Sequence, residues 1–178
     1  MLLSHDAIKA LVKRGVVQHA KEEAINAASL DIHLGPDILV EPINRPVLLD
    51  YRRRDKPNWM HCRVSEEGGY ILAPGEFILA QTIEVFNLPN NISAEYKLKS
   101  SMARIGLEHM NAGWCDAGWN GSVLTLEFKN MSSNSIRLRP GDAVGQIIFF
   151  KHEPVGEEAS YATRGRYNKD LTVKTIKE

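Results

Sequence analysis

The sequence is poor in cysteine, has no surplus of charge of either sign and contains no long apolar run. Cys62 and Cys115 are its only cysteines, too few and too far apart for a disulfide framework or a structural zinc site. Lys and Arg number 22, and so do Asp and Glu. This balance argues against a general nucleic-acid binder, because such a protein needs a basic surplus to displace counterions. No apolar run approaches the roughly 18 residues of a membrane span.

The amino terminus also lacks the pattern of a secretory signal, since it is polar by Ser4. The 178 residues, 43% of them hydrophobic and 25% charged, are suited to one compact domain and are too apolar for a disordered chain. We therefore expect a cytoplasmic protein that binds neither a membrane nor nucleic acid.

Several well-characterised catalytic motifs are missing as well. A zinc deaminase needs a His-x-Glu and a Pro-Cys-x-x-Cys to hold the metal and shuttle protons, and neither occurs here. The sequence contains no Gly-x-x-x-x-Gly-Lys-Ser/Thr loop, no Gly-x-Gly-x-x-Gly fingerprint and no Gly-x-Ser-x-Gly elbow. Chemistry that depends on these motifs is therefore excluded.

The pattern of apolar residues predicts one helix followed by many short strands. Ile8, Leu11 and Val12 recur at helical spacing near the amino terminus. Beyond them the period changes to two, which is typical of half-buried strands, and one later run is almost wholly apolar. These runs cover residues 30–34, 92–98, 123–128 and 143–150. A single helix followed by many strands predicts a mainly β fold, a sandwich or a barrel.

Two turns share the same chemistry. Segments 72–76 and 138–142 both read Leu-x-Pro-Gly followed by an acidic residue, and we interpret them as two β-hairpins. The charged segment 51–69 has no clear period, so we expect it to lie outside the sheet.

The carboxyl-terminal segment differs in composition from the rest of the chain. Of the 28 residues from 151 to 178, 11 are charged, so this segment cannot build a core of its own. We expect a catalytic domain over residues 1–150 and a tail over 151–178. The tail is either disordered or a flap that a ligand or a neighbouring subunit orders.

A basic, hydroxyl-rich run follows the predicted strand 92–98. Residues 97–104 include two lysines, two serines and one arginine. Arginine supplies a forked donor and lysine a point charge, and a helical turn starting at Ser100 would add free backbone N–H groups. The run indicates a phosphate cradle, although a capped helical turn with solvated cations explains the same residues.

A glycine-rich turn leads into the strand that carries Glu127. Asp116 is suited to bind a sugar hydroxyl and Trp119 to pack against a sugar or base, although a tight turn with a core tryptophan fits the same pattern. Glu127 alternates with Leu126 and Phe128, so it faces away from the core. On an open face it would be an ordinary carboxylate. In a cleft or subunit interface, burial would raise its pKa and suit it to proton transfer.

Taken together, these segments resemble the dCTP deaminase family, within the trimeric dUTP pyrophosphatase-like fold. The matching features are an early strand, an Arg/Lys-Ser-Ser-x-x-Arg phosphate motif, an Asp-x-Gly-aromatic turn, a glutamate-bearing strand, a Pro-Gly hairpin and a tyrosine-containing tail. In this sequence they are residues 29–35, 99–104, 116–119, 125–127, 140–146 and 166–170, with Tyr161 upstream. The serine motif alone is weak, but its ordered combination with the others is specific.

The resemblance implies a β-barrel or jelly-roll-type sandwich with an N-terminal helix and a C-terminal flap. It implies zinc-independent hydrolysis of dCTP to dUTP and ammonia, in pyrimidine deoxynucleotide metabolism. Glu127 would move protons between a bound water, N3 of the base and the leaving amine. Ser100 and the backbone carbonyl of Ala112 would hold that water, and Arg104 would orient Glu127. Without a metal to acidify the water, positioning carries more of the catalysis.

The resemblance also implies how the nucleotide binds. Basic and hydroxyl-bearing residues would hold the triphosphate as its Mg²⁺ complex, Asp116 would bind the 3′-hydroxyl, and the backbone around Thr125 would bind the base edge. Active sites would lie between subunits of a homotrimer, with the tail closing over them. The predicted substrate-binding residues are Lys99, Ser101, Asp116, Trp119, Thr125, Gln146, Tyr161, Arg166 and Asp170.

Some positions depart from the family pattern, and several functions stay open. Asp170 stands where the family has Gln, and a carboxylate there would repel phosphates unless the tail register differs or the residue helps hold metal. Arg166 replaces a Lys, and the loop 104–119 is one residue shorter than in many relatives. The alternatives are a bifunctional enzyme that also converts dUTP to dUMP and pyrophosphate, a plain dUTP pyrophosphatase, and a non-catalytic nucleotide-binding regulator. dUTP and dTTP are further possible ligands.

Overall fold

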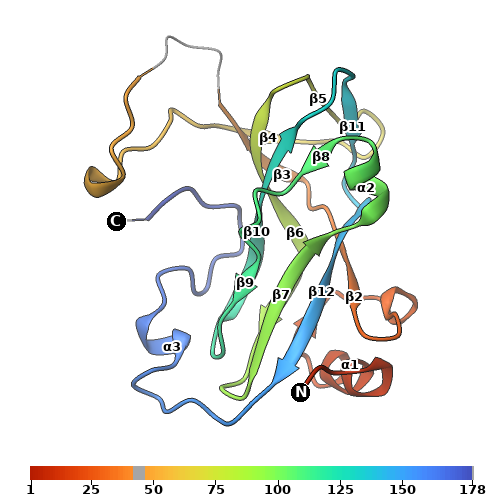
Figure 1. Ribbon diagram of the computed structural model, residues 1–178, viewed down its shortest axis with the longest axis vertical. Coiled ribbons are helices and arrows are strands. Elements are labelled where there is room, and N and C mark those ends of the chain that lie inside the picture. Colours follow the sequence, from red (N-terminus) through yellow and green to blue (C-terminus); the bar gives the residue numbers. More distant parts are fainter. Residues whose placement is uncertain (42–46, 178) are drawn as a thin grey trace.

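A computed structural model describes residues 1–41 and 47–177. Within these residues, short helices and twelve strands succeed one another, and Figure 1 shows their arrangement. Their bounds are α1 His5–Lys13, β1 Val17–Gln18, η1 Glu22–Ala24, β2 Leu30–His33, β3 Asp37–Val40, η2 Tyr51–Arg53, β4 Met60–Arg63, β5 Tyr70–Leu72, β6 Phe77–Asn87, β7 Ile92–Leu98, α2 Ser100–Arg104, β8 Leu107–Glu108, β9 Trp114–Cys115, β10 Asn120–Asn130, β11 Ile136–Leu138, β12 Ala143–Lys151 and α3 Tyr161–Arg164. The prediction of a mainly β fold with an N-terminal helix is confirmed. No described helix is long and apolar enough to cross a membrane.

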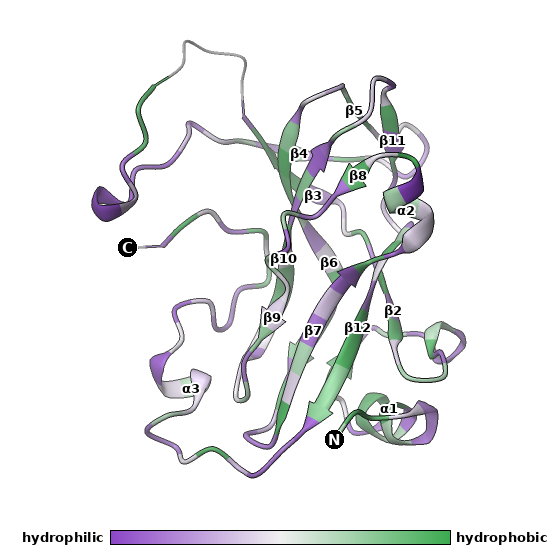
Figure 2. Cartoon of the chain, viewed as in Figure 1, coloured by the Kyte–Doolittle hydropathy of each residue, from purple (hydrophilic) through white to green (hydrophobic). Residues whose placement is uncertain are grey.

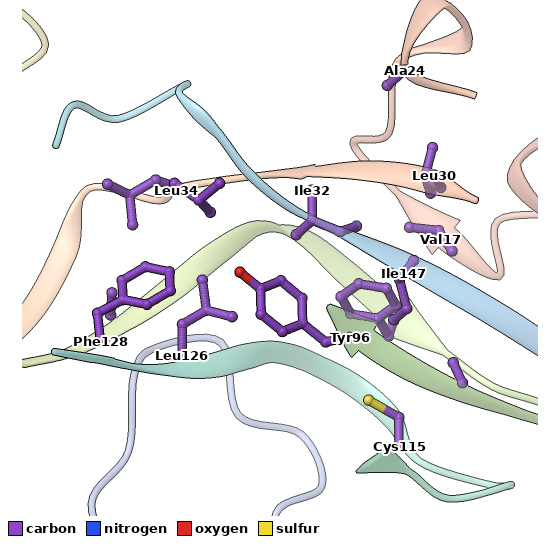
Figure 3. Close-up of a cluster of buried hydrophobic side chains, with 14 of the residues drawn as sticks. Val17, Ala24, Leu30, Ile32, Leu34, Tyr96, Cys115, Leu126, Phe128 and Ile147 are labelled. Atoms are coloured by element: carbon purple, nitrogen blue, oxygen red, sulfur yellow. The ribbon is translucent and has the colours of Figure 1, made fainter. Parts of the chain in front are cut away.

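Two antiparallel sheets face each other across a shared core. One runs β4-β3-β6-β10-β8, with β1 also paired to β6, and the other runs β2-β12-β7-β9. Figure 3 shows the apolar side chains between them, among them Ile32 from β2, Tyr96 from β7 and Leu126 from β10. In Figure 2 β12 is hydrophobic along most of its length, as expected for a strand of the core. Burial of the apolar side chains on the facing sides of the two sheets drives them together.

A bulge in β6 lies opposite β10, just before the functional residues of β10. Val123 lies opposite Val85 and Thr125 opposite Gln81, so β6 carries two more residues than β10 over this stretch, and the Leu124 N–H donates to Thr82 Oγ1 at 3.0 Å. Strict alternation would place Leu124 on the core face with Leu126 and Phe128. Leu124 is partly buried against that core, and it also lines a cavity together with Thr125 and Glu127. A bulge lets two strands continue to pair on both sides of such a register shift.

The Pro-Gly turns are present, but the prediction of two hairpins is wrong. Gly75 has φ 76° and Gly141 has φ 89°, a backbone conformation that favours glycine. The strand before each turn does not pair with the strand after it. β5 pairs with β11, with Leu72 opposite Ile136. Each turn therefore carries the chain from this small ribbon into one of the large sheets.

The prediction that segment 51–69 lies outside the sheet holds only in part. Met60–Arg63 forms β4, which pairs along β3 with Cys62 opposite Ile38. Most of this strand is exposed, so it lacks the apolar alternation by which a strand is recognised in a sequence. Backbone hydrogen bonds hold such an edge strand in place.

The tail is folded onto its own subunit. Figure 1 shows it running back beside β9 and β10 after β12 ends. The Lys169 N–H donates to the Asn120 carbonyl at 3.0 Å, and the Val173 N–H donates to Gln81 Oε1 at 2.7 Å. Val173 is buried against Leu39 and Leu79. Contacts within the one chain therefore order the tail, whereas we expected a disordered segment or one ordered by a ligand or neighbour.

Candidate functional site

A cavity of about 350 Å³ lies where the tail faces the outer side of β10 and the turn that precedes it. β10, the residues 112–119 and the tail each contribute to its wall. Seven of the predicted site residues line it: Ala112, Asp116, Trp119, Thr125, Glu127, Tyr161 and Asp170.

Glu127 is the titratable group best suited to chemistry in this cavity. It lies opposite Leu79 of β6 and is half-buried. Burial raises the pKa of its carboxyl to about 7, and a hydrogen bond from its own backbone opposes this rise. A carboxyl with such a pKa exists in both protonation states near neutral pH, so it can accept a proton and return it. Of the two possibilities for Glu127, the structure shows the sheltered one.

Asp116 lies at the rim of the cavity, in the turn between β9 and β10. Its Oδ1 accepts a hydrogen bond of 2.9 Å from Trp114 Nε1, and its side chain is exposed. Gly118 packs so closely on the tail that a Cβ there would lie 2.0 Å from Ser160 Oγ. Only glycine allows this approach, which keeps the Asp116 turn next to the tail.

Trp119 has a mainly structural environment. It is 6% exposed, stacks on Phe86 with ring centroids 5.3 Å apart, and donates from Nε1 to the Tyr167 carbonyl at 2.7 Å. It is therefore a core tryptophan with one edge on the cavity, and its polar atom holds the tail. Contact with a sugar or base remains a prediction.

The tail supplies further cavity residues that the sequence reasoning missed. Tyr167, Lys174, Thr175 and Ile176 line the wall beside the predicted Tyr161 and Asp170. The Lys174 N–H donates to Thr125 Oγ1 at 3.4 Å, which brings this stretch against the glutamate strand. The sequence signal that could have identified them is a lysine followed by a threonine, Lys174 and Thr175, downstream of the matched tail motif.

The residues that were predicted to bind phosphate form a separate group outside the cavity. Ser100, Ser101 and Arg104 lie on α2, the predicted helical turn, and all three are exposed. Lys99 forms an ion pair with Asp31. Gln146 is the strand partner of Asp31, and its Oε1 accepts a hydrogen bond of 2.8 Å from Ser29 Oγ. Figure 1 shows α2 on one side of β9 and β10 and the tail on the other.

Arg166 belongs to neither group. It is exposed, it does not line the cavity, and its carbonyl oxygen accepts a hydrogen bond from Lys177 Nζ at 2.8 Å. Within residues 1–41 and 47–177, no three His, Cys, Asp or Glu side chains are grouped so as to hold a metal ion. A single chain therefore brings Glu127 together with the residues that were predicted to bind the nucleoside. The helix α2, with its two serines and its arginine, lies away from the cavity.

Comparison of the chain with known protein families identifies the family of this protein. The family described as DCD, dCTP deaminase-like, matches residues 2–152. The chain belongs to this family. Members of the family are enzymes, and this chain is a dCTP deaminase. The predicted family and enzyme class are thus confirmed.

Individual relatives agree over nearly the whole length. A protein of Persephonella marina, named "dCTP deaminase, dUMP-forming", is 36% identical over 169 residues, which are 94% of this chain and 91% of the relative. One of Methanoculleus marisnigri with the same name is 33% identical over 187 residues, 96% of this chain and 97% of the relative. The similarity therefore includes most of the tail.

Solved structures confirm the fold. The 2′-deoxycytidine 5′-triphosphate deaminase from Agrobacterium tumefaciens superposes with a TM-score of 0.66 at 23% identity, covering 83% of this chain and 47% of that chain. The dUTPase from Streptococcus mutans gives a TM-score of 0.50 at 17% identity, covering 77% of this chain and 88% of that chain. The dUTPase-like fold that the sequence predicted is thereby established.

Proposed function

We propose that this deaminase is of the dUMP-forming type and converts dCTP to dUMP, pyrophosphate and ammonia. Relatives that match 94–96% of the chain carry that name. They favour the bifunctional alternative over our first interpretation, in which dUTP is the released product. The geometric observation that carries the proposal is the sheltered Glu127, whose pKa is raised to about 7 beside Thr125 and Ala112.

In the first step, water adds to C4 of the cytosine ring. The ionised Glu127 accepts a proton from this water as the C–O bond forms, and delivers it to N3. The ionised Glu127 then takes the proton of the new C4 hydroxyl and passes it to the amine, so that the C–N bond breaks, ammonia leaves and the C4 carbonyl of the uracil ring forms. This cycle requires an acid with a pKa near the working pH, which the half-buried Glu127 has. In the second step, a water cleaves the triphosphate to give dUMP and pyrophosphate.

The cavity residues have matching roles in this proposal. The backbone carbonyl of Ala112 helps hold the attacking water, the backbone around Thr125 binds the base edge, and Asp116 accepts a hydrogen bond from the 3′-hydroxyl. Tyr161 and Asp170 face the nucleotide from the tail, which closes over it and excludes water. Trp119 supports the sugar subsite from the core side.

The residues on and around α2 act, in this proposal, on the cavity of a neighbouring copy in a homotrimer. Ser100 holds the water, Arg104 orients the partner's acid, and Lys99 with Ser101 binds the triphosphate as its Mg²⁺ complex. This assignment is supported by the separation of the two groups of residues within one chain, because α2 is exposed and its residues do not line the cavity. Gln146 and Arg166 are weaker candidates, because Gln146 lies with Asp31 and Arg166 faces outward.

Product analysis tests this function directly. Purified protein is incubated with dCTP and Mg²⁺, and nucleotides are resolved by anion-exchange chromatography while ammonia and pyrophosphate are assayed. We expect equal amounts of dUMP, pyrophosphate and ammonia. Accumulation of dUTP with ammonia but without pyrophosphate would show instead a deaminase that stops at dUTP, and turnover of dUTP alone would show a plain dUTP pyrophosphatase.

A further inference from the structure

The buried carboxylate of Asp170 lies at the cavity in which we propose that dCTP, a polyanion, binds. Asp170 is 9% exposed and lines the wall. Its backbone is fixed on both sides, because the Val123 N–H donates to its carbonyl at 2.8 Å and its own N–H donates to Ser122 Oγ at 3.1 Å. The backbone of Asp170 therefore stays at the wall as long as the tail remains on β10. Alone, its charge would repel a nucleoside triphosphate.

Lys177 neutralises this carboxylate from seven residues further along the tail. Its Nζ lies 2.5 Å from Asp170 Oδ2 and also donates to the Arg166 carbonyl at 2.8 Å. The same ammonium lies 5.3 Å from the centroid of the Tyr167 ring. The Asp170 side chain is 12% exposed and that of Lys177 is 30% exposed, so solvent screens the pair only in part.

The backbone of Lys177 is held as well. Its N–H donates to the Tyr167 hydroxyl at 3.2 Å, and its carbonyl accepts from Arg54 Nη1 at 2.9 Å. These bonds close residues 166–177 into a loop whose inner side forms part of the cavity wall. Lys177 thus has a defined position and is not a freely moving surface lysine.

We propose that Lys177 is a positioning residue of the nucleotide site, which cancels the charge of Asp170 so that the cavity admits a nucleoside triphosphate. This inference rests on the proposed function to the extent that the cavity binds the substrate. Lys177 itself does not line the cavity, so it acts on the ligand through the charge of Asp170.

The test is a charge cycle with steady-state kinetics on dCTP in the full-length protein. Lys177→Met should raise KM about tenfold or more, because it leaves the Asp170 carboxylate without its cation beside the substrate, with little change in kcat. In the Asp170→Asn background, Lys177→Met should change KM by no more than about threefold relative to Asp170→Asn alone, since that background lacks the uncompensated charge. Lys177→Arg should retain a near-normal KM.

Two further measurements separate the charge effect from a structural one. Lys169→Met removes the same charge from an exposed position of the same segment and should leave KM unchanged. High salt should lower the KM of Lys177→Met toward that of wild type, because it screens the unpaired carboxylate. If Lys177→Met raises KM as much in the Asp170→Asn background as in wild type, the lysine acts only by holding the tail, and the inference is overturned.

Failure of this inference is distinguishable from failure of the proposed function. If wild type converts dCTP to dUMP while Lys177→Met and Lys169→Met have the same KM, the inference alone is wrong. If wild type releases dUTP from dCTP, the dUMP-forming proposal is wrong, while the charge cycle still reports on triphosphate binding. If wild type does not turn over dCTP, both fail.

Discussion

The indole Nε1 of Trp119 donates a hydrogen bond of 2.7 Å to the carbonyl oxygen of Tyr167, 48 residues further along the chain. This bond joins the turn before β10 to the tail and closes one end of the cavity. The Tyr167 carbonyl also accepts from Ser122 Oγ at 3.1 Å. A core side chain thus positions the segment that is proposed to cover the nucleotide.

Replacing Trp119 by Phe should loosen this connection. The phenyl ring can still stack on Phe86, but the N–H donor is lost, so we expect about 1 kcal/mol less stability and a severalfold higher KM for dCTP. The control is Trp59→Phe, because Trp59 packs edge-on against Phe77 and its indole N–H has no hydrogen-bond partner among the described residues. Equal KM values for the two variants would refute this role of Trp119.

Replacing Glu127 by Gln should abolish deamination while leaving nucleotide binding. The amide keeps the shape of the side chain but cannot shuttle a proton, so we expect kcat to fall by about 10²–10⁴-fold. Deamination is measured as ammonia release and binding as the heat of dCTP titration. Glu95→Gln is the matched control, since Glu95 pairs with Lys97 outside the cavity. Turnover at the wild-type rate in Glu127→Gln would contradict the mechanism.

The raised pKa of Glu127 also predicts a pH dependence of stability. The folded carboxyl, with a pKa of about 7 against an ordinary 4.5, retains a proton that the unfolded chain has already lost. The free energy of unfolding should therefore fall as the pH rises through this window, by up to about 3 kcal/mol for this group. Urea unfolding at pH 5 and pH 8 measures it. The free energy of unfolding of Glu127→Gln minus that of wild type should therefore be larger at pH 8 than at pH 5. A difference that does not change with pH would count against a sheltered acid.

Sites shared between subunits predict recovery of activity by mixing two inactive variants. Chains with Glu127→Gln and chains with Arg104→Ala are denatured, mixed in equal amounts and refolded. If each site combines Glu127 of one chain with Arg104 of a neighbour, about a quarter of the sites regain both residues. Each variant refolded alone serves as the control. A mixture with no more deamination than these controls would mean that the two residues act within one chain.

Removing the tail after Pro154 should weaken substrate binding while the two sheets persist. The truncated protein loses the tail partners of Trp119 and Ser122 and the buried Val173, so its melting temperature should fall. The KM for dCTP should rise by at least about tenfold, because one wall of the cavity is gone. Circular dichroism and kinetics check the two parts separately. Normal turnover by the truncated protein would refute the flap.

Much of this fold is predictable because its signals are local. The spacing of Ile8 and Leu11 specifies the first helix, and the alternation along 92–98 and 123–128 specifies strands whose one face is buried. Ordered motifs along the chain indicated the family and its acid, Glu127. These features depend on neighbouring residues, so they can be read without coordinates. β4 could not be recognised, because an exposed edge strand carries no such alternation.

Only the tertiary structure decided which residues meet. It paired β5 with β11 where hairpins were expected, and placed a bulge of β6 opposite the strand that carries Glu127. It also folded the tail back, so that Lys177 reaches Asp170 beside the cavity, and it left α2 elsewhere on the surface. Such contacts join segments that are remote in sequence or depend on the path of a whole loop. The local pattern of the sequence by itself therefore determined a mainly β fold with an acid on one strand, and long-range packing decided what surrounds that acid.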